Sequence, residues 1–253
     1  MLSPWAMRLP PVSKGEREPL RGPGPLLDGR LSAEIRKGFV RKVYGVLSTQ
    51  LLVTLCIAGP VMAYTKQLSK QDLQKLWAVG TIGSMLVIFA MHCCRSAVRA
   101  YPWAALLTFS AFKGLLFGAL SAHYSWQSLL LALGNTVLIF AAMTAYGVYS
   151  KTDYTGYGPY VHAAMFTFMF FGFTLGIMGW CGVHIHWMRV AFDLCGVLVF
   201  TFMIMFDTQR ILGEWGGHQY QFSVDDWMFA ALTLYTDITQ VFMHLLRLVG
   251  KRP

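Results

Sequence analysis

The stretch ALTLYTDITQVFMHLLRLVG, residues 231–250, is apolar enough to cross a membrane as a helix, yet Asp237 lies near its middle. Five polar residues recur in it at intervals of three and four: Thr233, Asp237, Gln240, His244 and Arg247. At about 100° per residue they form one stripe along an α-helix, with apolar residues on the other face. An ionisable group within a span is costly in lipid, so the stripe is expected to line the bundle interior or a pore. The alternative is that it supplies hydrogen bonds that hold the helices together.

The remainder of the chain has the composition of a membrane protein. Its residues are 55% hydrophobic and 13% charged, with a mean hydropathy of +0.48, whereas soluble domains carry about 25% charged residues. Apolar segments separated by short polar connections occur at 44–65, 77–94, 102–122, 127–149, 160–182, 187–212 and 225–248. Each is long enough for a hydrocarbon core of about 30 Å. The sequence therefore predicts an all-α polytopic membrane protein, a seven-transmembrane-helix bundle.

Two regions are distinguished along the chain. Residues 1–34 are rich in proline and are predicted to form a disordered cytosolic tail, and residues 35–253 to form the seven-helix membrane domain. The net charge of +9 comes from basic residues beside the apolar runs. This arrangement is typical of contact with lipid headgroups, so the lipid bilayer is the expected partner and nucleic acid is not. More basic residues lie on the side of the tail than on the opposite side, which places the N-terminus in the cytosol.

The sixth segment carries two further carboxylates. Asp207 lies near its cytosolic end, and Asp193 precedes it by fourteen residues, about 21 Å along a continuous helix. Asp193 is interpreted either as part of the pore-lining polar stripe or as a solvated helix end. For Asp207, the alternative to a functional role is an ion pair with Arg210 one turn away.

Asp207 and Asp237 can form a proton-sharing carboxyl pair if tilt or stagger of their helices brings them together. Two close carboxylates in a low dielectric do not both ionise cheaply, so they share a proton and titrate as a coupled pair. The ionised pair attracts cations, and the protonated pair is a neutral, hydrogen-bonded latch. Such a pair senses pH and gates cation passage. A third intramembrane charge, Lys113, either neutralises a carboxylate or extends toward the headgroups.

The motifs FDTQRILG (206–213) and LTLYTDITQVFMHLLRLVG (232–250) together resemble the last two spans of the transmembrane Bax-inhibitor-motif family, most closely its lifeguard branch. Further stretches are similar to that branch: FVRKVYGVLSTQLLVT (39–54), YPW (101–103) and YSKTDYT (149–155). The resemblance covers about residues 35 to 250.

This resemblance implies a bundle with the last helix at its centre. It also implies a pH-sensitive calcium leak through the membrane of the endoplasmic reticulum or Golgi, and suppression of cell death, in which membrane protein partners are possible. The paired aspartates of the family match Asp207 and Asp237, which would contact calcium transiently as the permeant ion, without a bound cofactor. The resemblance also implies that a basic residue at the end of the second span latches that pair; His92, Arg95 and Arg99 are candidates, and Arg95 is the expected latch. Lys113 departs from the acidic residue of some members and would oppose cation flow.

Two other functions are alternatives to a channel. One is a non-conducting scaffold that controls cell death by binding other membrane proteins. The other is an intramembrane zinc hydrolase, for which His162, His184 and His244 would have to converge although no span carries an H-x-x-x-H motif. The sequence favours a channel rather than an enzyme.

Overall fold

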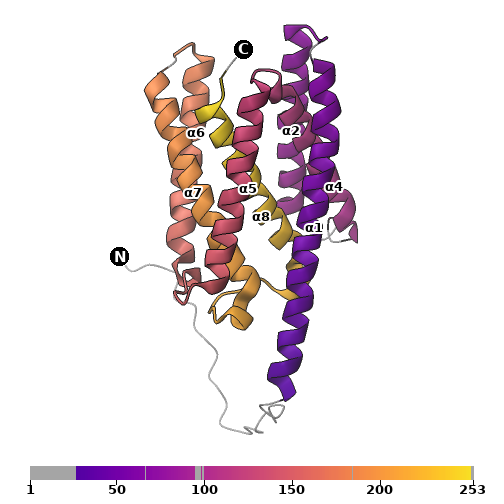
Figure 1. Ribbon diagram of the computed structural model, residues 1–253, viewed down its shortest axis with the longest axis vertical. Helices are drawn as coiled ribbons and strands as arrows, with labels where there is room; N and C mark the ends of the chain where they lie inside the picture. The colour runs from indigo at the N-terminus through magenta and orange to yellow at the C-terminus, as the bar shows by residue number, and fades with distance from the viewer. Residues whose placement is uncertain (1–26, 66, 95–97, 99, 184, 252–253) are drawn as a thin grey trace, which may run out of the picture.

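The computed structural model describes residues 27–65, 67–94, 98, 100–183 and 185–251. In these ranges the chain forms seven long α-helices and no strand (Figure 1). The helices are α1 (Leu27–Thr65), α2 (Lys70–Cys93), α4 (Pro102–Ser121), α5 (Trp126–Tyr149), α6 (Gly158–Trp180), α7 (His186–Leu212) and α8 (Trp227–Val249). Three short 3₁₀ segments lie in the connections: η1 (Thr155–Tyr157), η2 (Gly213–Gly216) and η3 (Val224–Asp226). The predicted all-α bundle of seven helices is confirmed.

Local sequence signals set several helix starts. Pro102 and Pro159 lie in the first turns of α4 and α6, where a missing N–H removes no helical hydrogen bond. Ser69 and Ser125 cap α2 and α5, each accepting a backbone N–H of the first turn. Pro60 lies inside α1, which continues to Thr65.

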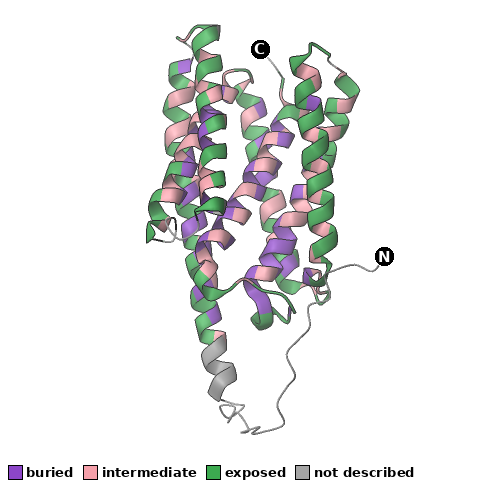
Figure 2. Cartoon of the chain, turned by 180° about the vertical axis from the view of Figure 1, so that it is seen from behind, coloured by how far each residue is buried: buried purple, intermediate pink, exposed green. Residues whose placement is uncertain are grey.

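Six helices of the described chain, α1, α2 and α4 to α7, are long and apolar enough to cross a membrane. The seventh, α8, carries the polar stripe and packs against α1, α4, α5 and α7. Figure 1 shows α8 in yellow between the group of α1, α2 and α4 and the group of α6 and α7. Buried residues gather along this central axis, while the outer faces of the surrounding helices are exposed (Figure 2). The chain is thus a multi-pass membrane protein with its last helix at the centre, as predicted.

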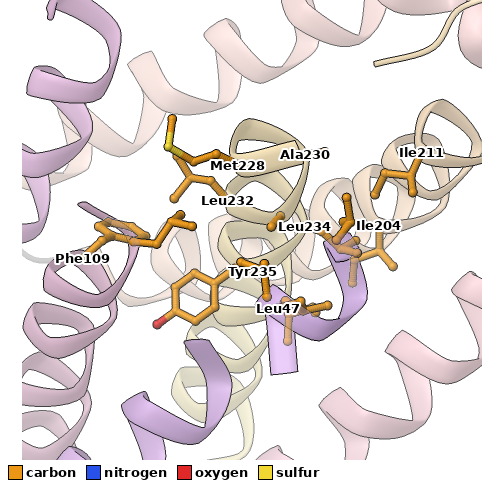
Figure 3. Close-up of a cluster of buried hydrophobic side chains, with 14 of the residues drawn as sticks. Leu47, Phe109, Ile204, Ile211, Met228, Ala230, Leu232, Leu234 and Tyr235 are labelled. Carbon is orange, nitrogen blue, oxygen red and sulfur yellow. The ribbon is translucent and has the colours of Figure 1, made fainter. Parts of the chain in front are cut away.

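The hydrophobic core is built around α8 (Figure 3). Tyr235 is fully buried, and its ring meets the edge of Phe109 on α4 with a centroid separation of 5.7 Å. Its hydroxyl lies 2.7 Å from the hydroxyl of Thr54 on α1. Aromatic packing and one buried polar contact therefore join α8 to α1 and α4.

The first helix differs most from its predicted range. It begins at Leu27, whereas the first apolar segment was placed at 44–65. Charged residues in its first turns interrupt the apolar pattern expected of a buried helix face. Arg36, Phe39 and Val43 are nevertheless all buried, at spacings of three and four. The predicted disordered tail falls mostly on residues 1–26, outside the described residues, and the part from Leu27 onward belongs to α1.

Candidate functional site

Asp207 and Asp237 meet at the interface of α7 and α8. Their exposed fractions are 1% and 4%, and the two carboxyl groups lie close enough to hydrogen-bond and to repel each other when both are ionised. Arg210 donates from Nη1 to Asp207 Oδ1 at 3.2 Å, and the hydroxyl of Thr233 also lies within hydrogen-bond reach of Asp207. The tilt of α8 thus supplies the contact that the sequence left undecided.

Among the residues that the structure describes, the charges of the aspartate pair and Arg210 balance when the pair holds one proton. Two carboxylates and one guanidinium carry a net charge of −1, so a shared proton makes the buried group neutral. The second oxygen, Oδ2, of each aspartate has no hydrogen-bond partner among the described residues. Buried carboxylate oxygens without donors are costly and are suited to accept a proton or a cation.

Arg210 is fixed on its other side by aromatic rings. Its guanidinium lies 4.0 Å from the ring centroid of Phe222, in the connection between α7 and α8, and 5.6 Å from that of Phe206. The ion pair between Asp207 and Arg210, predicted as an alternative to a functional role of Asp207, is present together with the contact between Asp207 and Asp237. Arg95, predicted as the latch, lies outside the described residues.

A second polar cluster lies farther along the same two helices: Asp193 and His244 are buried in it, and Arg247 is exposed at its edge. Asp193 Oδ1 is 2.8 Å from Nδ1 of His244 and 3.0 Å from Nε of Arg247. Asp193 is 7% exposed and His244 is 2% exposed. The interpretation of Asp193 as a solvated helix end is wrong, because α8 covers it and supplies its partners.

Aromatic rings surround the imidazole of His244. The ring of Phe200 stacks on it, and those of Phe168 and Phe192 meet it edge to face. Gly196 on α7 leaves the space for it, since a Cβ atom there would lie 2.5 Å from the ring. The second cluster is thus a closely packed bridge between α7 and α8.

The predicted stripe of α8 consequently contributes to two separate clusters. Thr233 and Asp237 belong to the first, and His244 and Arg247 to the second. Gln240, between them, is half-buried. On α4, Lys113 is half-buried with its Nζ 5.5 Å from the ring centroid of Phe109, and it forms no ion pair with any residue that the structure describes. A pore-lining role for the polar stripe and Asp193 stays a prediction, as does an effect of Lys113 on cation flow.

Sequence reasoning missed the residues that hold the C-terminal end of α7. Gln209, fully buried, accepts the N–H of Tyr154 at 2.9 Å and donates to the carbonyl of Thr152 at 2.9 Å. Asp153 accepts the backbone N–H of Gln219 at 2.8 Å. Gln209 lies in the motif FDTQRILG and Asp153 in the motif YSKTDYT. The motifs therefore contain both residues, but they give no sign of the partners that these residues bind.

Arg36 was also missed. Its guanidinium donates to the carbonyls of Leu212, Phe222 and Arg210 at 3.2, 2.6 and 2.7 Å. It lies in the predicted membrane domain (35–253) but before the first apolar segment (44–65), where a lone arginine carries no signal of burial.

Metal-ligating side chains do not gather in the described part of the chain, where no group of three or more His, Cys, Asp and Glu residues is placed to hold a metal ion. Of the histidines considered for zinc, His244 is buried between α7 and α8, whereas His162 is exposed on α6 and contacts the carbonyl of Gly158. His184 lies outside the described residues.

Comparison with known proteins identifies what the chain is similar to. The family model described as "Inhibitor of apoptosis-promoting Bax1" matches residues 36–253. Protein lifeguard 3 of Mus musculus is 26% identical over 223 residues, which is 87% of this chain and 71% of that protein. Protein lifeguard 3 of Homo sapiens is 26% identical over 239 residues, 91% of this chain and 73% of that protein. Protein lifeguard 4 of Mus musculus is 28% identical over 220 residues, 85% of this chain and 86% of that protein.

Proposed function

The chain belongs to the family of the inhibitor of apoptosis-promoting Bax1, and from this premise we propose that it is a pH-sensitive calcium leak channel linked to suppression of cell death. The observation that carries the proposal is the buried contact of Asp207 with Asp237, balanced by the single guanidinium of Arg210. The family and its lifeguard members support the coarser role, a membrane protein of cell-death control.

The chemistry of the pair explains how protons would control calcium. With one shared proton the two carboxyl groups and the guanidinium of Arg210 are together neutral, so they offer a divalent cation little attraction. Loss of the proton leaves two carboxylates beside one arginine. Calcium prefers carboxylate oxygens, and the Oδ2 atoms without donors would face it during passage. Calcium is the cargo of this site rather than a resident cofactor.

Several parts of the proposal rest on the sequence. Arg95 is proposed as the latch that holds the pair closed, and Lys113 as a charge that limits cation flow. The membrane is proposed to be that of the endoplasmic reticulum or Golgi, with the N-terminus in the cytosol and membrane proteins of cell-death control as partners. The chain is proposed to act as a channel, without enzymatic chemistry.

One observation favours a second candidate, a non-conducting scaffold. In the Asp193–His244–Arg247 cluster the side chains contact one another and aromatic rings enclose His244, as expected of a structural bridge between helices. In that case the aspartate pair would also be structural.

Calcium flux separates these candidates. The purified protein is reconstituted in liposomes, and calcium entry is measured over about pH 5 to 8 to follow the protonation of a coupled carboxyl pair. Wild type should show pH-dependent flux, and Asp207→Asn and Asp237→Asn should each remove the dependence. Asp225→Asn, an exposed carboxylate at the start of η3, is the control. Flux and pH profile that stay unchanged in both pair variants would exclude the channel mechanism, and loss of stability without a change in flux would favour the scaffold.

A further inference from the structure

Arg36 reaches the C-terminal end of the aspartate-bearing helix from a different part of the bundle. It lies on α1, is 6% exposed, and packs its guanidinium 4.6 Å from the ring centroid of Phe39. Its three nitrogens donate to three backbone carbonyls, those of Arg210 and Leu212 at the end of α7 and that of Phe222 in the following connection. One side chain therefore joins α1 to two segments more than 170 residues away.

These carbonyls require partners that the helix does not supply. The last carbonyls of an α-helix have no internal donor and carry the negative end of the helix dipole. A buried guanidinium supplies both a set of hydrogen-bond donors in a fixed plane for these carbonyls and a positive charge for the negative end of the dipole. The carbonyl of Arg210 additionally accepts the N–H of Phe222 at 3.1 Å. Arg36 therefore adds three side-chain hydrogen bonds to this junction between the end of α7 and the following connection.

This junction continues to the aspartate pair. The ring of Phe222, whose carbonyl Arg36 holds, lies against the guanidinium of Arg210 at 4.0 Å. Arg210 in turn donates to Asp207 at 3.2 Å. A chain of direct contacts thus runs from Arg36 through Phe222 and Arg210 to the carboxylate that contacts Asp237.

The charged and polar groups around this chain come from several elements. Asp237 and Thr233 face Asp207 from α8, and Glu214 of η2 acts on Arg36 electrostatically. Tyr44 of α1 lies beside Thr208, which is next to Asp207 on α7, and beside Thr144 of α5. Arg210 is the one cation in direct contact with the pair among the residues that the structure describes. Its placement therefore decides how much positive charge the pair experiences.

We propose that Arg36 is a positioning residue of the proton-sensing pair: it fixes the connection between α7 and α8 so that Phe222 holds Arg210 against Asp207. This inference rests on the proposed function of Asp207 and Asp237. It assigns to α1 a direct part in setting the pH response of the aspartate pair on α7 and α8. A purely structural helix cap would affect stability and leave that response unchanged.

The test compares Arg36→Gln, Arg210→Gln and the double variant by calcium flux against pH, with thermal unfolding measured in parallel. Removing a cation from a carboxylate favours its protonated form, so Arg210→Gln should move the flux midpoint upward by about one pH unit. Arg36→Gln should move it in the same direction, and the double variant should match Arg210→Gln alone. Lys37→Gln, on the exposed side of the same helix, should leave the midpoint unchanged.

Other results overturn the inference. A lower unfolding temperature of Arg36→Gln with an unchanged midpoint would identify a structural cap, and additive shifts in the double variant would exclude action through Arg210. Arg36→Lys keeps the charge but cannot make the three-carbonyl fork, so it serves if Arg36→Gln fails to fold. The same upward shift is expected for it, and a wild-type midpoint would contradict positioning. If Asp207→Asn removes the pH dependence while the Arg36 variants do not shift it, this inference alone fails; if Asp207→Asn has no effect, the proposed function fails.

Discussion

Gly196→Ala should destabilise the protein by forcing apart the second polar cluster. The added Cβ would lie 2.5 Å from Cε1 and Nε2 of His244, about 1 Å closer than an ordinary carbon contact. The imidazole has little freedom to retreat, because Phe200 stacks on one face and Asp193 holds Nδ1 at 2.8 Å. Either the backbones of α7 and α8 separate or the hydrogen bond is lost.

The size of the effect follows from those two routes. Overpacking a close-packed site costs about 1–3 kcal/mol, and loss of a hydrogen bond to a charged group about 1.5–3 kcal/mol. A net loss of about 2 kcal/mol is expected, which corresponds to a fall of about 4–8 °C in unfolding temperature for a chain of this size. Thermal unfolding of the purified protein in one detergent measures it.

Gly134→Ala provides the matched control, because a Cβ there meets nothing within 4 Å on the exposed face of α5. Its unfolding temperature should stay equal or rise slightly, since alanine is the better helix former. In a Gly196→Ala background, His244→Ala should cost less than it does alone. An unfolding temperature of Gly196→Ala equal to that of Gly134→Ala would refute the packing argument.

Two further substitutions test the connections of the bundle. Burial raises the pKa of Asp153, but the hydrogen bonds from Gln219 and Thr155 outweigh burial and hold this pKa below its ordinary value. Ionised Asp153 therefore stabilises the folded protein above the unfolded pKa of about 4. This stabilisation is lost as the pH falls through the pKa of the folded state. Asp153→Asn should lower the free energy of unfolding by about 1 kcal/mol at neutral pH. In unfolding scans at acid pH the variant and wild type should be equally stable, and a difference that stays constant with pH would contradict this prediction. Tyr235→Phe removes the 2.7 Å contact with Thr54 and should cost about 1 kcal/mol in thermal unfolding, whereas Tyr160→Phe, 75% exposed, should cost nothing measurable.

The sequence predicted the helices well because each carries a strong local signal. Long apolar runs located six spans, and the prolines at 102 and 159 located two starts. The central position of α8 was expected from the family resemblance, and the polar residues at spacings of three and four favoured an inward face. The start of α1 was misplaced because its charged residues conceal the buried period of Arg36, Phe39 and Val43.

The sites were predicted only in part because contacts across helices depend on tilt. The sequence identified Asp207 and Asp237 and the ion pair with Arg210, but their meeting required the crossing of α7 and α8. The stripe suggested one continuous line, whereas the contacts with α7 divide it into two clusters. The partners of Arg36 are backbone carbonyls, which have no side-chain signature in the sequence.

The central claim is that protonation of the aspartate pair controls calcium passage. Infrared spectroscopy of the protein in liposomes follows the C=O stretch of a protonated carboxyl group, and calcium flux is measured in the same liposomes over about pH 5 to 8. The account predicts one midpoint for both signals in wild type, with the band and the pH dependence of flux both lost in Asp237→Asn. Two different midpoints, or a flux that keeps its pH dependence when the band is gone, would contradict it.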